Sequence, residues 1–271
     1  MSSATEPSTA RPSTAARIYD YLLGGVHNFP ADREVAQKVI AALPHVREAA
    51  RANPAFLGRA VQYSAEQGID QFIDIGSGIP TQGNVHEIAH AVRPDARVVY
   101  VDIDPLAVAQ SLDLLAEEDR ATAVRGDLRE PDAILANPEL RRMLDLSRPV
   151  GLLLFAVLHF VPDDELAYGV VERLQRELVS GSHFAASHGA TETVPPPEQA
   201  QSMERAYDQR TMTGAGKPRT REEFARFFTG WDVVEPGLVW VPQWRPDDQV
   251  PADMVADPTI SGCWAGAARK P

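Results

Sequence analysis

Short apolar runs alternate with segments of helical spacing through the middle of the chain. The runs cover residues 71–75, 97–102, 121–128, 150–158 and 182–187, and each has the length and apolar character of a buried strand. Between them, apolar side chains recur every three or four residues over residues 85–92, 105–115, 132–144 and 166–178, which predicts four helices. The order β-α-β-α-β-α-β-α-β predicts an α/β fold, a doubly wound, mostly parallel sheet with helices on both faces.

The two ends of the chain depart from this alternation. Residues 1–14 are rich in Ser, Thr, Ala and Pro, which predicts a disordered tail. Residues 15–67 have helical spacing, with an interruption expected near Asn53-Pro54, and are predicted to form a helical lid or cap. Residues 68–271 form the predicted main domain. Its tail is expected to contain a polar helix (198–210), a capping box (220–223) and strands at 231–234, 238–241 and 262–268, the last two pairing as an antiparallel hairpin.

Special residues gather where the predicted strands end. The first strand runs into a turn with Gly76 and Gly78, the second ends at Asp102, and the third ends beside Asp127. Parallel strands bring their carboxyl ends to one edge of the sheet, where ligands of such folds bind. Glycines permit sharp turns and close approach of a ligand, and a following helix N-terminus offers free N–H groups. The pattern predicts a nucleotide-like ligand at this edge.

Composition excludes several other functions. The 26 basic and 38 acidic residues give a net charge of -12, and no basic block is present, which argues against nucleic acid as the main partner. The single cysteine, Cys263, excludes a disulfide framework and fits a reducing cytosol. The sequence has no run of about 18 apolar residues and no secretory signal pattern, so we expect a cytoplasmic protein without a membrane span.

Two ligand classes fit the glycine turn. A dinucleotide site requires G-x-G-x-x-G, but the third position is Thr81, and the nearest glycine, Gly83, comes two residues late. Asp102 follows Gly78 by 24 residues (102 − 78), a spacing that suits a ribose diol in both classes. The additional acid Asp127 and the antiparallel end of the sheet disfavour an NAD-dependent oxidoreductase, which remains the less favoured alternative.

The motifs at these strand ends resemble those of class I S-adenosylmethionine-dependent methyltransferases, which have a Rossmann-like sheet. The resemblance rests on Asp74–Gly78, Val101–Asp104, Gly126–Leu128 and Leu158–Pro162, and departs from the common pattern at Pro80. Residues 16–28, followed by 31–34, also resemble the N-terminal signature of an actinobacterial S-adenosylmethionine methyltransferase family that has no assigned acceptor.

The resemblance implies a set of residues for binding S-adenosyl-L-methionine. Asp102 would accept both ribose hydroxyls, and Asp127 would accept the adenine amino group, since ionised carboxylates are acceptors only. Ile103 and Leu128 would enclose the adenine, while Arg17 would pair with the methionine carboxylate. Gly76, Ser77 and Gly78 would lie along the methionine and ribose, and carbonyls near Phe155 and Ala156 would receive the ammonium group. The implied set also includes Asp74, Asp104 and Gly126.

The acceptor side is less specific in the sequence. Methyl transfer from a sulfonium depends mainly on alignment, and it needs a general base only when the acceptor is protonated. His159, His188 and Tyr21 are weak candidates for such a role, each with packing as the simpler explanation. Tyr19, His27, Trp240 and Trp244 are candidates for an acceptor pocket. No metal-ligand spacing is present, and a small-molecule acceptor is expected. A regulatory protein that binds S-adenosylmethionine without catalysis is the alternative.

Overall fold

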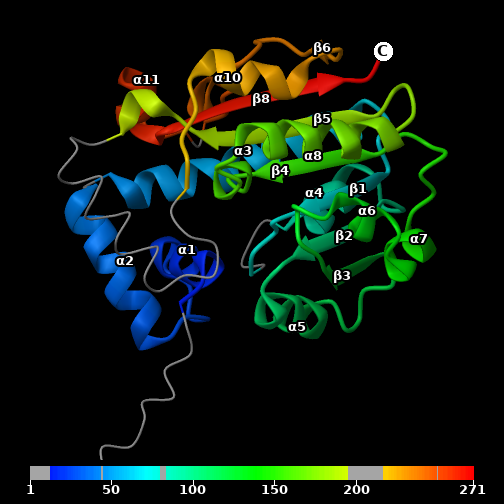
Figure 1. Cartoon of the computed structure of the whole chain (residues 1–271), viewed down its shortest axis with the longest axis horizontal. Helices are drawn as coiled ribbons and strands as arrows, with labels where there is room; N and C mark the ends of the chain where they lie inside the picture. Colours follow the sequence, from blue (N-terminus) through cyan, green and yellow to red (C-terminus); the bar gives the residue numbers. More distant parts are fainter. Residues whose placement is uncertain (1–12, 44, 80–83, 195–215, 249) are drawn as a thin grey trace, which may run out of the picture.

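The computed structural model describes residues 13–43, 45–79, 84–194, 216–248 and 250–271. A sheet of eight strands forms its centre, with the order β3-β2-β1-β4-β5-β8-β6 and β7 paired to β8 (Figure 1). Five strands are parallel: β1 (Gln71–Ile75), β2 (Arg97–Asp102), β3 (Ala121–Arg125), β4 (Gly151–Phe155) and β5 (His183–Gly189). The predicted α/β fold with a mostly parallel sheet is therefore confirmed.

The C-terminal strands run against the others. β8 (Cys263–Arg269) pairs antiparallel with β5, and its other edge pairs antiparallel with β6 (Asp232–Val233) and β7 (Val239–Trp240). The expected pairing of the last two strands is confirmed. The structure adds that β8 is an internal strand, so the sheet continues beyond β5 through β8 to β6 and β7.

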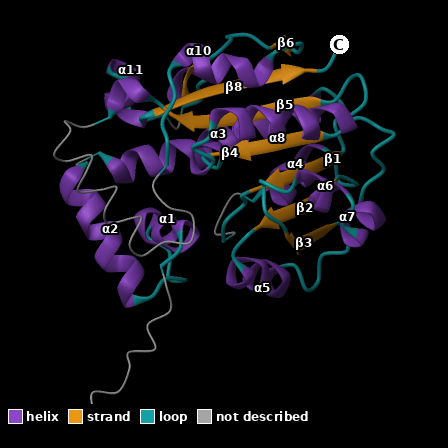
Figure 2. Cartoon of the chain, in the orientation of Figure 1, coloured by secondary structure: helices purple, strands orange, loops and turns teal. Residues whose placement is uncertain are grey.

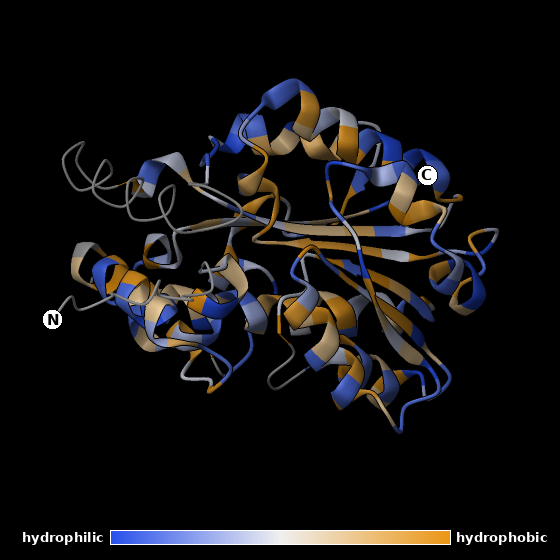
Figure 3. Ribbon diagram, turned by 60° about the horizontal axis from the view of Figure 1, so that its bottom comes forward, coloured by the Kyte–Doolittle hydropathy of each residue, from blue (hydrophilic) through white to orange (hydrophobic). Residues whose placement is uncertain are grey.

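Helices cover both faces of the sheet (Figure 2). One face is covered by α6 (Pro131–Leu135), α7 (Pro138–Met143), α8 (Asp164–Glu177) and α10 (Arg221–Ala225). The other is covered by α3 (Val46–Glu66), α4 (Val85–Val92), α5 (Pro105–Leu114) and α11 (Ala252–Ala256). The strands are largely apolar along their length, whereas the covering helices are apolar on one side and hydrophilic on the other (Figure 3). This amphipathic pattern is what places each helix on the sheet.

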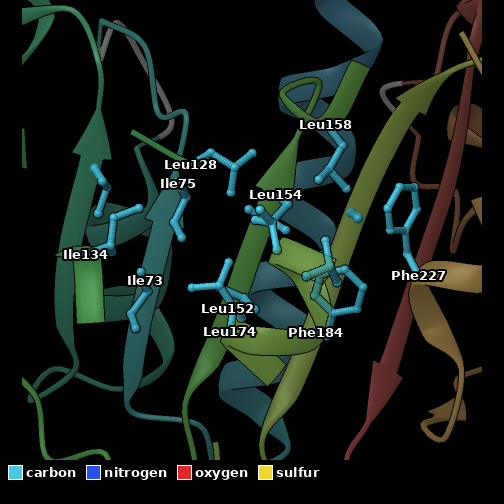
Figure 4. Close-up of a cluster of buried hydrophobic side chains, with 14 of the residues drawn as sticks. Ile73, Ile75, Leu128, Ile134, Leu152, Leu154, Leu158, Leu174, Phe184 and Phe227 are labelled. Carbon is cyan, nitrogen blue, oxygen red and sulfur yellow. The ribbon is translucent and has the colours of Figure 1, made fainter. Parts of the chain in front are cut away.

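Alternating strand residues form the core beneath α8. Ile73 and Ile75 of β1 and Leu152 and Leu154 of β4 point toward the same side, where they meet side chains of the covering helices (Figure 4). Ile134, Leu174, Phe184 and Phe227 complete this group. Because successive strand residues point to opposite faces, the intervening positions of the same strands fill the second core under α3.

A smaller helical unit stands beside the carboxyl ends of the parallel strands (Figure 1). It consists of α1 (Ala15–Leu23) and α2 (Pro30–Ala42), which pack with the start of α3 around their own apolar cluster. We call α1 and α2 the cap. The rest of α3 packs on the sheet, so the boundary between cap and main domain lies within the predicted lid segment rather than at residue 67.

Several local expectations need correction. α3 is continuous through Pro54, whereas an interruption was expected there. The single helix expected over 132–144 is two helices, because Asn137 caps a new helix whose first residue is Pro138. Ser13 and Thr14 are buried rather than disordered. Residues 1–12 and the polar helix expected over 198–210 lie outside the described residues.

Candidate functional site

The glycine turn after β1 is folded tightly against the segment that follows β4. Gly76 and Gly78 have φ values of 78° and 66°, a region that favours glycine. A Cβ atom on Gly76 would lie 2.4 Å from Cγ2 of Val157. Glycine is therefore required at position 76 both by its backbone angle and by close packing.

Asp102 is held at the end of β2 by main-chain donors. The N–H of Gly78 donates to Oδ2 at 2.8 Å, and the N–H of Asp104 donates to Oδ1 at 2.8 Å. The side chain is buried, and burial raises its pKa, an effect that these two backbone hydrogen bonds oppose. Each oxygen keeps acceptor capacity, so the oriented carboxylate suits a vicinal diol.

Asp74 is a second buried acid on the same edge. Among the residues that the structure describes, none donates a hydrogen bond to its carboxylate. Burial, and secondarily the charge of Asp102, raise the pKa of Asp74 to about 7. A buried carboxyl without a protein partner is suited to a cationic group of a ligand.

The third acid is paired within the protein. Asp127 receives hydrogen bonds from Nε and Nη2 of Arg129, and this pairing lowers the pKa of Asp127. Ile103 and Leu128 lie near it on the same cavity wall. Gly126 is packed too closely for a side chain, since a Cβ there would lie 2.7 Å from Cγ1 of Val101.

The end of β4 is also constrained. Ala156 has a φ of 48°, which is unusual for a residue with a side chain. Its N–H donates to the carbonyl and the hydroxyl oxygen of Ser187, and that hydroxyl donates to Oδ1 of Asn53 on α3. Phe155 and Ala156 therefore present their backbone to the cavity in a conformation that β5 and α3 maintain.

These features surround one cavity of about 1280 Å³. The glycine turn and the three acids form one part of its wall. The opposite part is built from the cap, the start of α3, the segment after β4, and residues near positions 190, 217 and 260. From the predicted cofactor set, the lining includes Asp74, Gly76, Ser77, Gly78, Asp102, Ile103, Asp104, Gly126, Asp127, Leu128, Phe155 and Ala156.

Arg17 has a different place from the one expected. It does not line the cavity; its Nε donates to Asp32 at 3.0 Å and its Nη1 donates to Asp104 at 3.2 Å. All three side chains are buried. The structure thus places Arg17 between two buried acids rather than on the cavity wall, where pairing with a methionine carboxylate was expected.

Of the three weak catalytic candidates, only His159 lies on the cavity wall. Its Nδ1 is buried and has no hydrogen-bond partner among the described residues, and burial, with the nearby charge of Arg219, lowers its pKa to about 4. His159 is therefore neutral at pH 7. This leaves it able to accept a hydrogen bond from a bound molecule.

His188 and Tyr21 are not at the cavity. His188 is fully buried, and its ring nitrogens lie 2.9 Å from the Gly189 carbonyl and from Nη1 of Arg219. Tyr21 packs with the cap cluster, with the Arg47 guanidinium over its ring. The structure thus places neither residue on the cavity wall, where a catalytic group is expected.

Of the residues expected to line an acceptor pocket, one lines the cavity and three do not. Tyr19 lines the cavity and donates its hydroxyl to the Ala50 carbonyl. Trp244 is buried against Phe56, and Trp240 stacks on Trp264, so both pack rather than line the cavity. His27 is not part of the lining and lies near Asp20.

Sequence reasoning missed two contributors to this site. Asn53 was noted only as a helix interruption, yet it joins α3 to the end of β4. Arg219 is fully buried and donates to the carbonyls of Leu158 and Val161, on either side of His159. Neither belongs to a local motif, so only their positions in space indicate a role.

Within the described ranges, no group of three or more His, Cys, Asp or Glu side chains is arranged to hold a metal ion. None of the helices in the same ranges is long and apolar enough to cross a membrane.

Known proteins provide an independent comparison. A family model described as S-adenosyl methyltransferase matches residues 2–271. A crystal structure of a candidate methyltransferase from Thermobifida fusca YX is 39% identical, with a TM-score of 0.87 over 97% of this chain and 96% of that chain. A DUF574 family protein from Streptomyces avermitilis MA-4680 is 42% identical, with a TM-score of 0.87 over 96% of this chain and 98% of that chain. None of the curated proteins matches.

Proposed function

The chain belongs to the S-adenosyl methyltransferase family, and on this premise we propose that it transfers the methyl group of S-adenosyl-L-methionine to a small-molecule acceptor. One observation carries the proposal. The acids at the ends of β1 and β2 and the apolar side chains of the cap line the same cavity of about 1280 Å³. Cofactor and acceptor can therefore meet in one cavity.

The donors and acceptors on the wall fit this cofactor. Asp102 has a fixed carboxylate for the ribose hydroxyls. Asp74 has a buried carboxyl for the methionine ammonium group, which would favour the ionised acid. Asp127 would accept from the adenine amino group while it keeps its pairing with Arg129, since a carboxylate has about four lone-pair sites.

The chemistry asks little of the protein beyond alignment. S-adenosyl-L-methionine supplies an activated methyl group when bound. The chain's residues orient the ribose through Asp102, exclude water with the cap, and place the acceptor beside the end of β4. His159 is neutral and can accept a hydrogen bond from the O–H or N–H group of the methyl acceptor. This hydrogen bond directs a lone pair of that oxygen or nitrogen toward the methyl group.

Calorimetry with S-adenosylhomocysteine tests the cofactor assignment. We expect the wild-type protein to bind it and Asp102→Ala to lose at least about tenfold in affinity, because hydrogen bonds to a charged group are lost. Asp132→Ala is the matched control, since that acid lies on α6 with an exposed side chain. Binding of NAD but not of S-adenosylhomocysteine would overturn the proposal.

Catalysis needs a separate measurement. Release of S-adenosylhomocysteine from S-adenosyl-L-methionine is followed with panels of phenols, amines and carboxylic acids as acceptors. We expect turnover with at least one small molecule and its loss in Asp102→Ala. Tight cofactor binding without turnover on any acceptor would instead favour the regulatory alternative.

A further inference from the structure

A buried charge cluster joins the cap to the main domain beside the cofactor edge. Arg17 of α1 bridges Asp32 of α2 and Asp104 at the N-terminus of α5. Thr14, which caps α1, donates its hydroxyl to the same Oδ2 atom of Asp104 at 2.8 Å. The relative exposure of these four residues is at most 5%. Asp104 therefore receives two donors from the cap on one oxygen.

The other atoms of Asp104 connect this cluster to the cavity. Its Oδ1 caps α5 by accepting from the N–H of Leu106 at 2.9 Å. Its backbone N–H donates to Oδ1 of Asp102 at 2.8 Å. A short path of hydrogen bonds thus runs from Arg17 and Thr14, through Asp104, to the carboxylate that faces the cavity.

We propose that Arg17 is a positioning residue for the cofactor, acting through Asp104 to hold the Asp102 carboxylate in the orientation that binds the ribose hydroxyls. The inference rests on the proposed function, because it takes Asp102 as the ribose-binding acid. It goes further by making the cap a structural requirement for ribose recognition. The cap then has two duties, since Thr14 and the first residues of α1 also line the cavity.

Electrostatics supports the same role. Asp74, Asp102 and Asp104 are three buried acids at one edge, and the charge of Asp104 contributes to the raised pKa of Asp102. Arg17 pairs with Asp104 and so offsets the charge that disfavours ionised Asp102. Loss of the guanidinium would leave Asp32 and Asp104 buried without it, which allows both the chain position and the protonation state of Asp102 to change.

A ligand pair separates this role from general support of the fold. S-adenosylhomocysteine and its analogue without the ribose 2′-hydroxyl are titrated into wild type, Arg17→Leu and Asp104→Asn. In wild type, loss of the hydroxyl should raise Kd by about tenfold, the equivalent of one hydrogen bond to a carboxylate. In both variants this ratio should fall below about threefold, while Kd for S-adenosylhomocysteine itself rises by about tenfold. Asp104→Asn also removes a charge that raises the pKa of Asp102, so a fall of the ratio in that variant reports the lost positioning of Asp102 and not a loss of its ionisation.

The two variants differ in their risk of unfolding. Arg17→Leu leaves two buried acids without the cation that pairs with them, whereas Asp104→Asn retains a good helix cap and nearly the same shape. Arg47→Leu is the control, because it makes the same change near the cap where the guanidinium lies over Tyr21 and the residue contacts neither acid. We expect it to keep the wild-type Kd ratio.

The outcomes distinguish this inference from the proposed function. If Arg17→Leu and Asp104→Asn weaken both ligands equally and keep the wild-type ratio, Arg17 only supports the fold and the inference is overturned. If Asp102→Ala binds S-adenosylhomocysteine as wild type does, the proposed cofactor site itself is wrong. Loss of the ratio in both variants, with the Arg47→Leu control unchanged, supports the inference.

Discussion

The two sides of the cavity are built in different ways. The cofactor side consists of three short runs at the ends of neighbouring strands: the glycine turn, Asp102 to Asp104, and Gly126 to Leu128. The acceptor side is assembled from the cap, α3, the segment after β4 and parts of the C-terminal region, which lie far apart in the chain. The first side can therefore be recognised locally, while the second depends on how distant segments pack.

Their electrostatics also differ. On the cofactor side, burial raises the pKa of Asp74 and of Asp102. On the acceptor side, burial lowers the pKa of His159 to about 4 and that of His188, behind the wall, to about 3. Burial disfavours the charged forms of Asp74, Asp102 and the two histidines, but only the acids gain from a cation. This contrast suits a cationic cofactor on one side and a neutral acceptor on the other.

The largest effect is expected at the glycine turn. Gly76→Ala should abolish measurable binding of S-adenosylhomocysteine and lower stability, because it combines left-handed backbone strain of ~1–2 kcal/mol with overpacking of ~1–3 kcal/mol against Val157. Gly78→Ala is the matched control, since its Cβ would meet nothing within 4 Å and only the strain remains. Calorimetry and urea unfolding measure both. Equal losses in the two variants would contradict the packing argument.

The acceptor side should control acid stability. Burial lowers the pKa values of His159 and His188, so as pH falls below about 6.5 the unfolded chain binds protons that these two residues do not bind in the folded protein. We expect the free energy of unfolding to fall between pH 6.5 and pH 4, by on the order of a few kcal/mol. The raised pKa of Asp74 acts in the opposite direction, because its stabilising protonated form is lost as pH rises toward 7.

Urea unfolding between pH 4 and pH 7 measures this dependence. His188→Gln should reduce the slope, since the variant has one buried imidazole fewer to protonate on unfolding. A wild-type stability that is constant over this range would show that the acids balance the histidines and would remove the proposed contrast between the two sides.

The cofactor side should release protons on binding. With a pKa of about 7, roughly half of the Asp74 carboxyls carry a proton at pH 7, and a bound ammonium group favours the ionised form. Calorimetry in two buffers of different ionisation enthalpy should then detect release of about half a proton per S-adenosylhomocysteine at pH 7, and much less at pH 9. Asp74→Asn should remove this release; its persistence in the variant would assign the proton to another group.

The smallest effect is expected at His159, and it tests whether the cofactor side and the acceptor side of the cavity are separate. His159→Gln should change Kd for S-adenosylhomocysteine by less than about twofold, because the ring lies on the acceptor side and a neutral side chain replaces a neutral imidazole. With any acceptor that the wild-type enzyme methylates, the same variant should show slower turnover. A loss of affinity above about tenfold would place His159 against the cofactor and would break the division proposed here.

Much of the cofactor side was predictable because each of its residues belongs to a strand end. Alternation of strands and helices placed Asp74, Asp102 and Asp127 at one edge, and the resemblance to class I methyltransferases named their ligand, in agreement with the family match. Arg17 lies behind this edge rather than on the cavity wall where the resemblance places it. Its sequence neighbours give no sign that Asp32 and Asp104 would enclose it.

The sequence by itself determined the sheet, the edge at which we propose that the cofactor binds, and the family, since periodicity and short motifs are local properties of the chain. Only the tertiary structure decided which side chains reach the cavity. In the structure His159 lines the cavity, whereas His188 and Tyr21 do not. The cap is connected to Asp102 through Asp104. These outcomes depend on contacts between residues far apart in the chain, such as Thr14 and Asp104, which are 90 positions apart, and only the folded packing brings such residues together.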